Sequence, residues 1–207
     1  MEEVQQFEEP VAKYGKLYTY ADYLAWEFDR RVEILRGKLF WMSPAPSTSH
    51  QKTSGLLTRK FYSYFHEKHS CSVFVAPFDV RLPNRKTKSE KDEQVNTVFQ
   101  PDLCVVCDSH KIDRRGCLGA PNLIIEILSP GNSKTELNYK FDIYEEAGVL
   151  EYWMVNYSEQ VIFQYFAEGG RLISHRPKTV DDEIESIIFS ELRFAVADIF
   201  EGVNAHL

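Results

Sequence analysis

Two short apolar segments, each carrying one carboxylate, restrict the fold of this chain more than any other feature of its sequence. The first occupies residues 99–107 and has Asp102 near its beginning, and the second occupies residues 122–128 and has Glu126 near its middle. Continuous short apolar runs are typical of strands that are buried on both faces of a sheet. An ionised carboxylate buried without a partner costs several kcal/mol. We therefore expect the two carboxylates to share a partner, and a divalent cation is the simplest one.

The rest of the chain predicts a mixture of helices and strands. Before Asp102 the pattern predicts a short helix from Thr19, a hairpin of residues 32–35 and 38–42 that turns at 36–37, and a long helix over 47–69. It then predicts a strand over 73–82 with a bulge or edge at Pro77, and a charged surface loop over 84–96. After Glu126 it predicts a helix that begins at Ser133 and ends at Gly148, strands at 152–155, 161–166 and 171–174, and an apolar tail over 187–200 that packs on the sheet. We expect an N-terminal arm over residues 1–16 and one α/β domain over 17–207.

Composition and charge exclude some classes of protein. The net charge of −7 argues against a protein that coats nucleic acid without specificity, although it leaves room for a nuclease with a local basic surface. No apolar run approaches the ~20 residues that a membrane span needs. The first six residues are acidic and polar and do not resemble a signal peptide. We therefore predict a cytoplasmic protein that does not enter a membrane.

The four cysteines do not predict a metal site. Cys104 and Cys107 form a CxxC pattern, but within a strand residues three apart point to opposite faces and cannot share a metal ion. Cys71 and Cys117 lie in no metal-binding motif. We predict that all four are free thiols.

The positions of the two carboxylates suit a magnesium or manganese site. Asp102 follows Pro101 at the start of its strand, where a proline is tolerated because the first residue need not donate to the ladder. Glu126 shares one strand face with Ile124 and Leu128. If the two strands are neighbours, both carboxylates converge at one rim of the sheet. Hard oxygen ligands of this kind suit Mg²⁺ or Mn²⁺, which can polarise a phosphoryl oxygen and activate water.

The order of these motifs resembles a known family. A Pro-Asp pair followed by a glutamate in an apolar strand is similar to the PD-(D/E)XK nuclease superfamily, and the chain more narrowly resembles the Uma2-type (DUF820) endonucleases. The resemblance runs from about Tyr18 to Phe200. The segments that carry it are 32–37 (VEILRG), 49–51 (SHQ), 76–82 (APFDVRL), 100–103 (QPDL), 126–130 (EILSP), Lys140 and 147–153 (AGVLEYW).

The resemblance implies a restriction-endonuclease-like mixed β-sheet core flanked by helices, with an N-terminal helix and hairpin added. It also implies that Asp102 and Glu126 are metal ligands. The superfamily has a lysine two residues after the glutamate, where this chain has Leu128, and in Uma2-type chains a lysine on the next helix, here Lys140, substitutes for it. Two positions that are usually aspartate in such chains are Glu136 and Asn156 here, and neither is one of the proposed ligands.

Three more residues are candidates for the site: Asp79, which would assist the metal, and His50 and Glu33, which would lie near it. Each also has a simpler structural interpretation, which the sequence leaves open. Asp79 would only pair with Arg81, His50 would be a core histidine satisfied by a backbone carbonyl, and Glu33 would be an exposed strand residue opposite Lys38. Lys140 has the alternative of an i,i+4 pair with Glu136, and Asp102 has that of a cap or turn residue at the mouth of its strand.

The expected function is metal-dependent hydrolysis of phosphodiester bonds in nucleic acid, with DNA the expected substrate and Mg²⁺ or Mn²⁺ the cofactor. Lys140 would orient the attacking water or stabilise the charge that develops on the phosphate. The alternative is a catalytically inactive module that keeps the nuclease fold and binds nucleic acid or protein. The sequence leaves a homodimer open.

Overall fold

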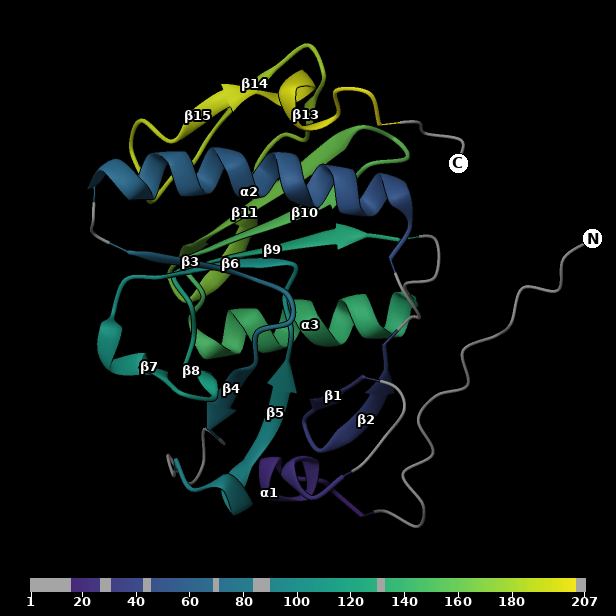
Figure 1. Cartoon of the computed structure of the whole chain (residues 1–207), viewed down its shortest axis with the longest axis vertical. Helices are drawn as coiled ribbons and strands as arrows, with labels where there is room; N and C mark the ends of the chain where they lie inside the picture. Colours follow the sequence, from purple (N-terminus) through teal and green to yellow (C-terminus); the bar gives the residue numbers. More distant parts are fainter. Residues whose placement is uncertain are drawn as a thin grey trace, which may run out of the picture.

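The computed structural model describes residues 16–26, 31–42, 46–68, 71–83, 90–129 and 133–203. Two long helices and two large sheets dominate it (Figure 1). The helices are α1 (Tyr20–Leu24), α2 (Thr48–Lys68) and α3 (Lys134–Ala147), with short 3-10 turns at Asp92–Gln94, Ser109–Lys111 and Val196–Ile199. The predicted arm over residues 1–16 lies almost entirely outside the described residues.

The central sheet has seven strands and is covered by a helix on each face. Its order is β12-β11-β10-β9-β6-β3, with β13 paired to β11. Its strands are β3 (Ser72–Val75), β6 (Leu103–Val106), β9 (Leu123–Leu128), β10 (Glu151–Asn156), β11 (Val161–Glu168), β12 (Arg171–Ser174) and β13 (Lys178–Thr179). Helix α2 lies over one face and α3 over the other (Figure 1). Among the described strands of this sheet, β9 and β10 form the one parallel pair, because α3 provides the crossover between them.

The second sheet lies on the far side of α3 from the central sheet (Figure 1). Its order is β2-β1-β5-β4-β8-β7. Its strands are β1 (Val32–Leu35), β2 (Lys38–Trp41), β4 (Val80–Pro83), β5 (Val95–Phe99), β7 (Ile112–Asp113) and β8 (Gly116–Leu118). A two-stranded sheet of β14 (Glu183–Glu185) and β15 (Arg193–Ala195) covers α2 at the C-terminal end of the chain. The predicted α/β class with a mixed sheet flanked by helices is confirmed.

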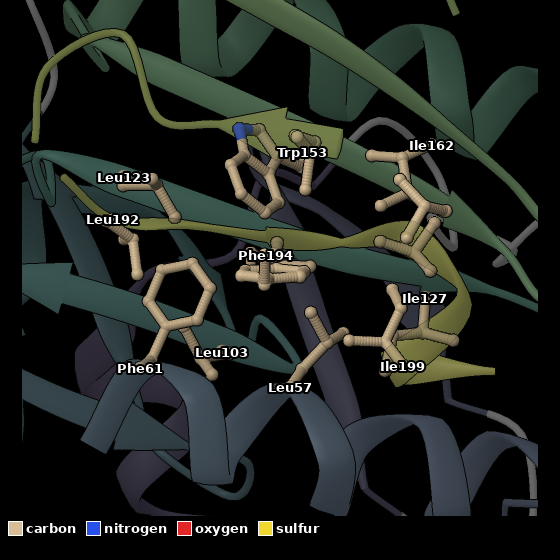
Figure 2. Packing of buried hydrophobic residues seen from close by; sticks show 14 of the residues in the cluster. Leu57, Phe61, Leu103, Leu123, Ile127, Trp153, Ile162, Leu192, Phe194 and Ile199 are labelled. Carbon is tan, nitrogen blue, oxygen red and sulfur yellow. The ribbon is translucent and has the colours of Figure 1, made fainter. Parts of the chain in front are cut away.

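The main core fills the space between α2, the central sheet and the C-terminal segment. Leu57 and Phe61 of α2 point toward Trp153 on β10 and toward Phe194 and Ile199 near the C-terminus (Figure 2). The predicted apolar tail therefore packs against the sheet as expected. A second core, which includes Tyr144 of α3, joins the other face of the central sheet to the second sheet.

Local sequence signals set the ends of the elements that position the site. The side chain of Ser133 accepts a hydrogen bond from the Glu136 N–H (3.1 Å) and so begins α3, and Gly148 ends α3 in the left-handed region at a φ of 82°. Arg36 and Gly37 both have positive φ angles, 51° and 80°, which lets β1 turn directly into β2.

Two predicted segment boundaries are wrong. The predicted strand over 73–82 is two strands in different sheets, β3 and β4, because residues 76–79 carry the chain from one sheet to the other. Pro77 lies in this crossing, where its missing N–H interrupts no ladder. The predicted loop over 84–96 ends earlier than expected, since β5 begins at Val95, and its residues 84–89 lie outside the described residues.

The prediction of four free thiols is also wrong. Ser72 pairs with Val106 across β3 and β6, so the next pair outward brings Cys71 opposite Cys107, and these two form a disulfide. Cys104 and Cys117 are free and buried. Cys104 and Cys107 do pack into different cores on opposite faces of the sheet, as the CxxC argument required.

Candidate active site

Asp102 and Glu126 meet on one face of the central sheet. Strands β6 and β9 are antiparallel neighbours with Leu103 opposite Ile125, and the same register continued by one residue places Asp102 opposite Glu126. Residues opposite each other in an antiparallel pair share a face. The Asp102 carboxylate also accepts a hydrogen bond from the Ile127 N–H (2.7 Å), which fixes it to the neighbouring strand. The predicted convergence of the two carboxylates is present.

Glu126 is a buried carboxylate that is fully engaged by donors. It is 8% exposed, and both of its oxygens lie 3.2 Å from the Lys140 Nζ. The Tyr144 hydroxyl donates a further hydrogen bond to Oε1 (2.5 Å). Burial raises the pKa of Glu126 to about 7 although the Lys140 charge lowers it, and the charges of Asp102 and Glu33 add to the rise.

Lys140, Glu126 and Glu33 form one buried cluster, in which Lys140 keeps its charge. It is 5% exposed, and its Nζ lies 3.0 Å from Oε2 of Glu33. Glu136, the partner in the simpler i,i+4 interpretation, is also in contact but is farther away, at 3.8 Å. Burial acts to lower the pKa of Lys140, but the three carboxylates outweigh it and the pKa lies well above its usual value.

Glu33 belongs to the cluster and is not an exposed strand residue. It is 2% exposed and pairs with Phe40 across the hairpin, so the expectation that it would lie opposite Lys38 is wrong. Besides Lys140, Glu33 binds the backbone N–H of Gln100, which donates to Oε1 at 2.9 Å. Its position on β1 therefore links the second sheet to the site on the central sheet.

His50 approaches the site from the first turn of α2. Its Nε2 lies 3.3 Å from Oδ1 of Asp102, and its Nδ1 is buried without a hydrogen-bond partner among the residues that the structure describes. Burial acts to lower the pKa of His50, but the hydrogen bond to Asp102 and the charges of Asp102 and Glu126 raise it above the usual value. A hydrogen bond to the Ile127 backbone also raises the pKa of His50, but by less than Asp102 does. The simpler interpretation, a core histidine satisfied by a backbone carbonyl, therefore leaves out the main partner of His50, which is Asp102.

Asp79 lies outside this cluster. Its carboxylate accepts hydrogen bonds from the Gln100 side chain (2.8 Å) and from the Tyr20 hydroxyl (3.3 Å). Within the described ranges no hydrogen bond or ion pair joins Asp79 to the two candidate ligands, and it reaches Glu33 only through Gln100. The simpler interpretation, a pair between Asp79 and Arg81, is not found either, because Arg81 binds Asp113 at 2.6 Å.

Sequence reasoning missed two residues of the site. Tyr144 is not among the predicted site residues, yet it follows Lys140 by four residues, and residues at that spacing lie side by side on a helix. That spacing was the available signal. Gln100 acts through its backbone N–H as well as its side chain, and no sequence pattern reports a backbone contact.

The donor set fits a hexacoordinate cation that retains water. Mg²⁺ is commonly held by one or two carboxylates, with water and substrate phosphate as the other ligands. The described residues contain no group of three or more His, Cys, Asp or Glu side chains arranged to enclose a metal ion. Asp102 and Glu126 are the two carboxylates that meet here, and each contacts a basic side chain, His50 and Lys140 respectively.

Comparison with known proteins identifies the family. A family model for Uma2, described as "Putative restriction endonuclease", matches residues 20–197. The chain belongs to the Uma2 family. The match covers both sheets and every residue of the candidate site, so the resemblance inferred from the sequence is confirmed.

The chain is also similar to a relative and to a solved structure. The chain is 24% identical to "Uncharacterized protein slr1290" of Synechocystis sp., over 94% of this chain and 96% of the relative. It is also similar to a crystal structure from Anabaena variabilis described as a "putative nuclease belonging to DUF820", with a TM-score of 0.71 and 19% identity over 90% of this chain and 99% of that one. At 19% identity the similarity to the Anabaena variabilis structure supports the fold alone. In the part of the chain that is described, no helix is long and apolar enough to cross a membrane.

Proposed function

We propose that this Uma2 protein is a metal-dependent nuclease that hydrolyses phosphodiester bonds, with Asp102 and Glu126 as the ligands of Mg²⁺ or Mn²⁺. The observation that carries the proposal is the Asp102–Glu126 pair on neighbouring strands with the buried Lys140 ammonium against it. Two carboxylates and a lysine at one point of a sheet are costly to bury, and their combination matches the needs of phosphoryl chemistry.

In this proposal the two carboxylates hold the metal, and Lys140 acts on the phosphate. When bound, the cation would neutralise charge on a phosphate oxygen and lower the pKa of a coordinated water. The Ile127 N–H fixes one oxygen of the Asp102 carboxylate against the neighbouring strand β9. The Lys140 ammonium supplies a positive charge in a site of low dielectric, where it stabilises the charge that develops on the phosphate more strongly than it would in water.

His50 and Tyr144 support the two proposed ligands. His50 donates from the start of α2 to Asp102. Tyr144 donates to Glu126 and limits its rotation. Asp79 contributes only indirectly. It binds the Gln100 side chain, and the Gln100 backbone N–H binds Glu33.

One observation favours the alternative, an inactive binding module. Lys140 and Tyr144 already contact the Glu126 carboxylate, so this buried group has partners that do not depend on a metal ion. A module that binds nucleic acid would retain these contacts and would show no cleavage with any metal.

A cleavage assay separates the two functions. The parent, D102N and E126Q would be incubated with single-stranded, duplex and structured DNA and RNA, with Mg²⁺, Mn²⁺ or a chelator. D198N, which changes a carboxylate on the far side of α2, is the matched control. We expect metal-dependent cleavage by the parent and D198N and a loss of about 10³-fold or more in both site variants. Binding of substrate without cleavage under every condition would favour the inactive module.

A further inference from the structure

The Lys140 ammonium is shared by two buried carboxylates from different sheets. Glu33 on β1 and Glu126 on β9 each place both oxygens near Nζ, at 3.0 and 3.2 Å for Glu33 and at 3.2 Å for each oxygen of Glu126. Both carboxylates are more than nine-tenths buried. The ammonium therefore has two nearly equivalent carboxylate partners, one from each sheet.

A divalent cation on Glu126 would remove one of these partners. The cation would take oxygens that Nζ now contacts, and the two positive charges would repel each other at short range. A buried ammonium that loses a carboxylate without replacement is strongly destabilised. Glu136 is a poor replacement, because its carboxylate is 3.8 Å from Nζ and lies closer to solvent than Glu33.

Glu33 can take over because its own position is fixed. The Gln100 N–H donates to it at 2.9 Å, and the Gln100 side chain is in turn held by Asp79. The Tyr20 hydroxyl of α1 binds the other oxygen of Asp79. This chain of contacts ties Glu33 to α1 and to the residue that follows β5, so the carboxylate stays in place when Lys140 leaves Glu126.

We propose that Glu33 is a positioning residue that retains the Lys140 ammonium beside the substrate phosphate when a divalent cation occupies Asp102 and Glu126. The proposal rests on the nuclease function proposed above and adds a residue to it. Glu33 holds no metal and touches no reacting atom. It acts by giving Lys140 a second partner, so that the lysine does not compete with the cation for Glu126.

The competition between Lys140 and the cation for Glu126 predicts that substitutions of Glu33 and Lys140 do not act independently on Mn²⁺ affinity. In E33Q the near carboxylate left to the ammonium would be Glu126, so Mn²⁺ would have to displace the ammonium and would bind more weakly. Removing the ammonium as well, in E33Q/K140M, would relieve this competition. Calorimetric titration with Mn²⁺ would compare the parent, K140M, E33Q and the double variant. We expect K140M to tighten binding by less than about threefold in the parent and by tenfold or more in the E33Q background.

A matched control separates this coupling from a simple change of charge. E136Q removes a carboxylate that also contacts Nζ, but at the longer distance of 3.8 Å. We expect K140M to have the same effect on Mn²⁺ affinity in the E136Q background as in the parent. If K140M changed Mn²⁺ affinity by the same factor in the parent, E33Q and E136Q, Glu33 would act only through its charge, and the proposal would be overturned.

Turnover and a conservative variant complete the test. At saturating Mn²⁺ we expect E33Q to cleave nearly as slowly as K140M, because the lysine is no longer held in place. E33D keeps the charge but shortens the side chain by one methylene, so it serves as the test variant if E33Q fails to fold. We expect E33D to change Mn²⁺ affinity and turnover in the same directions as E33Q, to a smaller degree. Parent-like affinity and turnover in E33D would also overturn the proposal. If the parent binds no Mn²⁺, the nuclease proposal falls together with this one, whereas metal binding and cleavage without coupling would overturn only the role of Glu33.

Discussion

Replacing Lys140 by methionine should destabilise the metal-free protein severely. Methionine matches the length of the lysine stem but removes the positive charge that both Glu33 and Glu126 contact, and these residues are 2% and 8% exposed. Removing one partner of a buried ion pair typically costs about 3–5 kcal/mol, because the remaining charge is left without compensation. Tyr144 and the Gln100 N–H remain as donors, so each carboxylate keeps one hydrogen bond.

The size of the effect follows from the length of the chain. An unfolding entropy of about 2.1 cal/mol/K per residue gives about 0.4 kcal/mol/K for 207 residues. A loss of about 3–5 kcal/mol then lowers the melting temperature by about 7–12 °C. Thermal and urea unfolding in a chelator, followed by circular dichroism, measure this directly. K134M is the control, because Lys134 is exposed in the first turn of the same helix and its loss should change stability by less than about 0.5 kcal/mol.

A fall in stability of less than about 1 kcal/mol in K140M would refute this reasoning. It would mean that the ammonium is not needed to balance Glu33 and Glu126. Lys140 would then resemble an ordinary surface partner of Glu136, whose contribution is small.

Three further outcomes test other parts of the structure. Thiol titration of the unfolded, unreduced protein should count two free thiols, and reduction should lower stability by about 3–4 kcal/mol, since the Cys71–Cys107 disulfide closes a loop of 36 residues; a count of four would contradict the disulfide. E151A should cost at least about 3 kcal/mol in urea unfolding, because Glu151 is fully buried and accepts hydrogen bonds from five donors, and a cost under 1 kcal/mol would rule out that role. Y144F should lower stability by about 1–3 kcal/mol in the same assay, through loss of the donor to Glu126, and unchanged stability would show that this hydrogen bond contributes little.

The carboxylate pair could be predicted from sequence because the burial of each strand can be inferred locally. Leu-Ile-Ile-Glu-Ile-Leu places Glu126 in a strand that is buried on both faces, and the Pro-Asp pair places Asp102 at a strand start. Their adjacency required only that the two strands be neighbours, which the family resemblance supplied. Lys140 followed from the same resemblance and from the helical pattern of α3.

The contacts that depend on pairing distant segments could not be predicted. The partners of Glu33 are Lys140 and Gln100, which are 107 and 67 residues away, and no local pattern links them. The Cys71–Cys107 disulfide likewise depends on the register of β3 against β6. The division of residues 73–82 between two sheets has the same origin, because the choice of sheet is made by the partner strands and not by the segment itself.

The dependence of metal binding on Glu126 is the most direct test of the proposed site. Thermal unfolding of the parent and E126Q would be measured with a chelator and with saturating Mn²⁺. A cation that binds only the folded state should stabilise the parent by about 1–3 kcal/mol, and E126Q should show no metal-dependent shift because one of the two proposed ligands is lost. An equal shift in both proteins would contradict the assignment of Glu126 as a metal ligand.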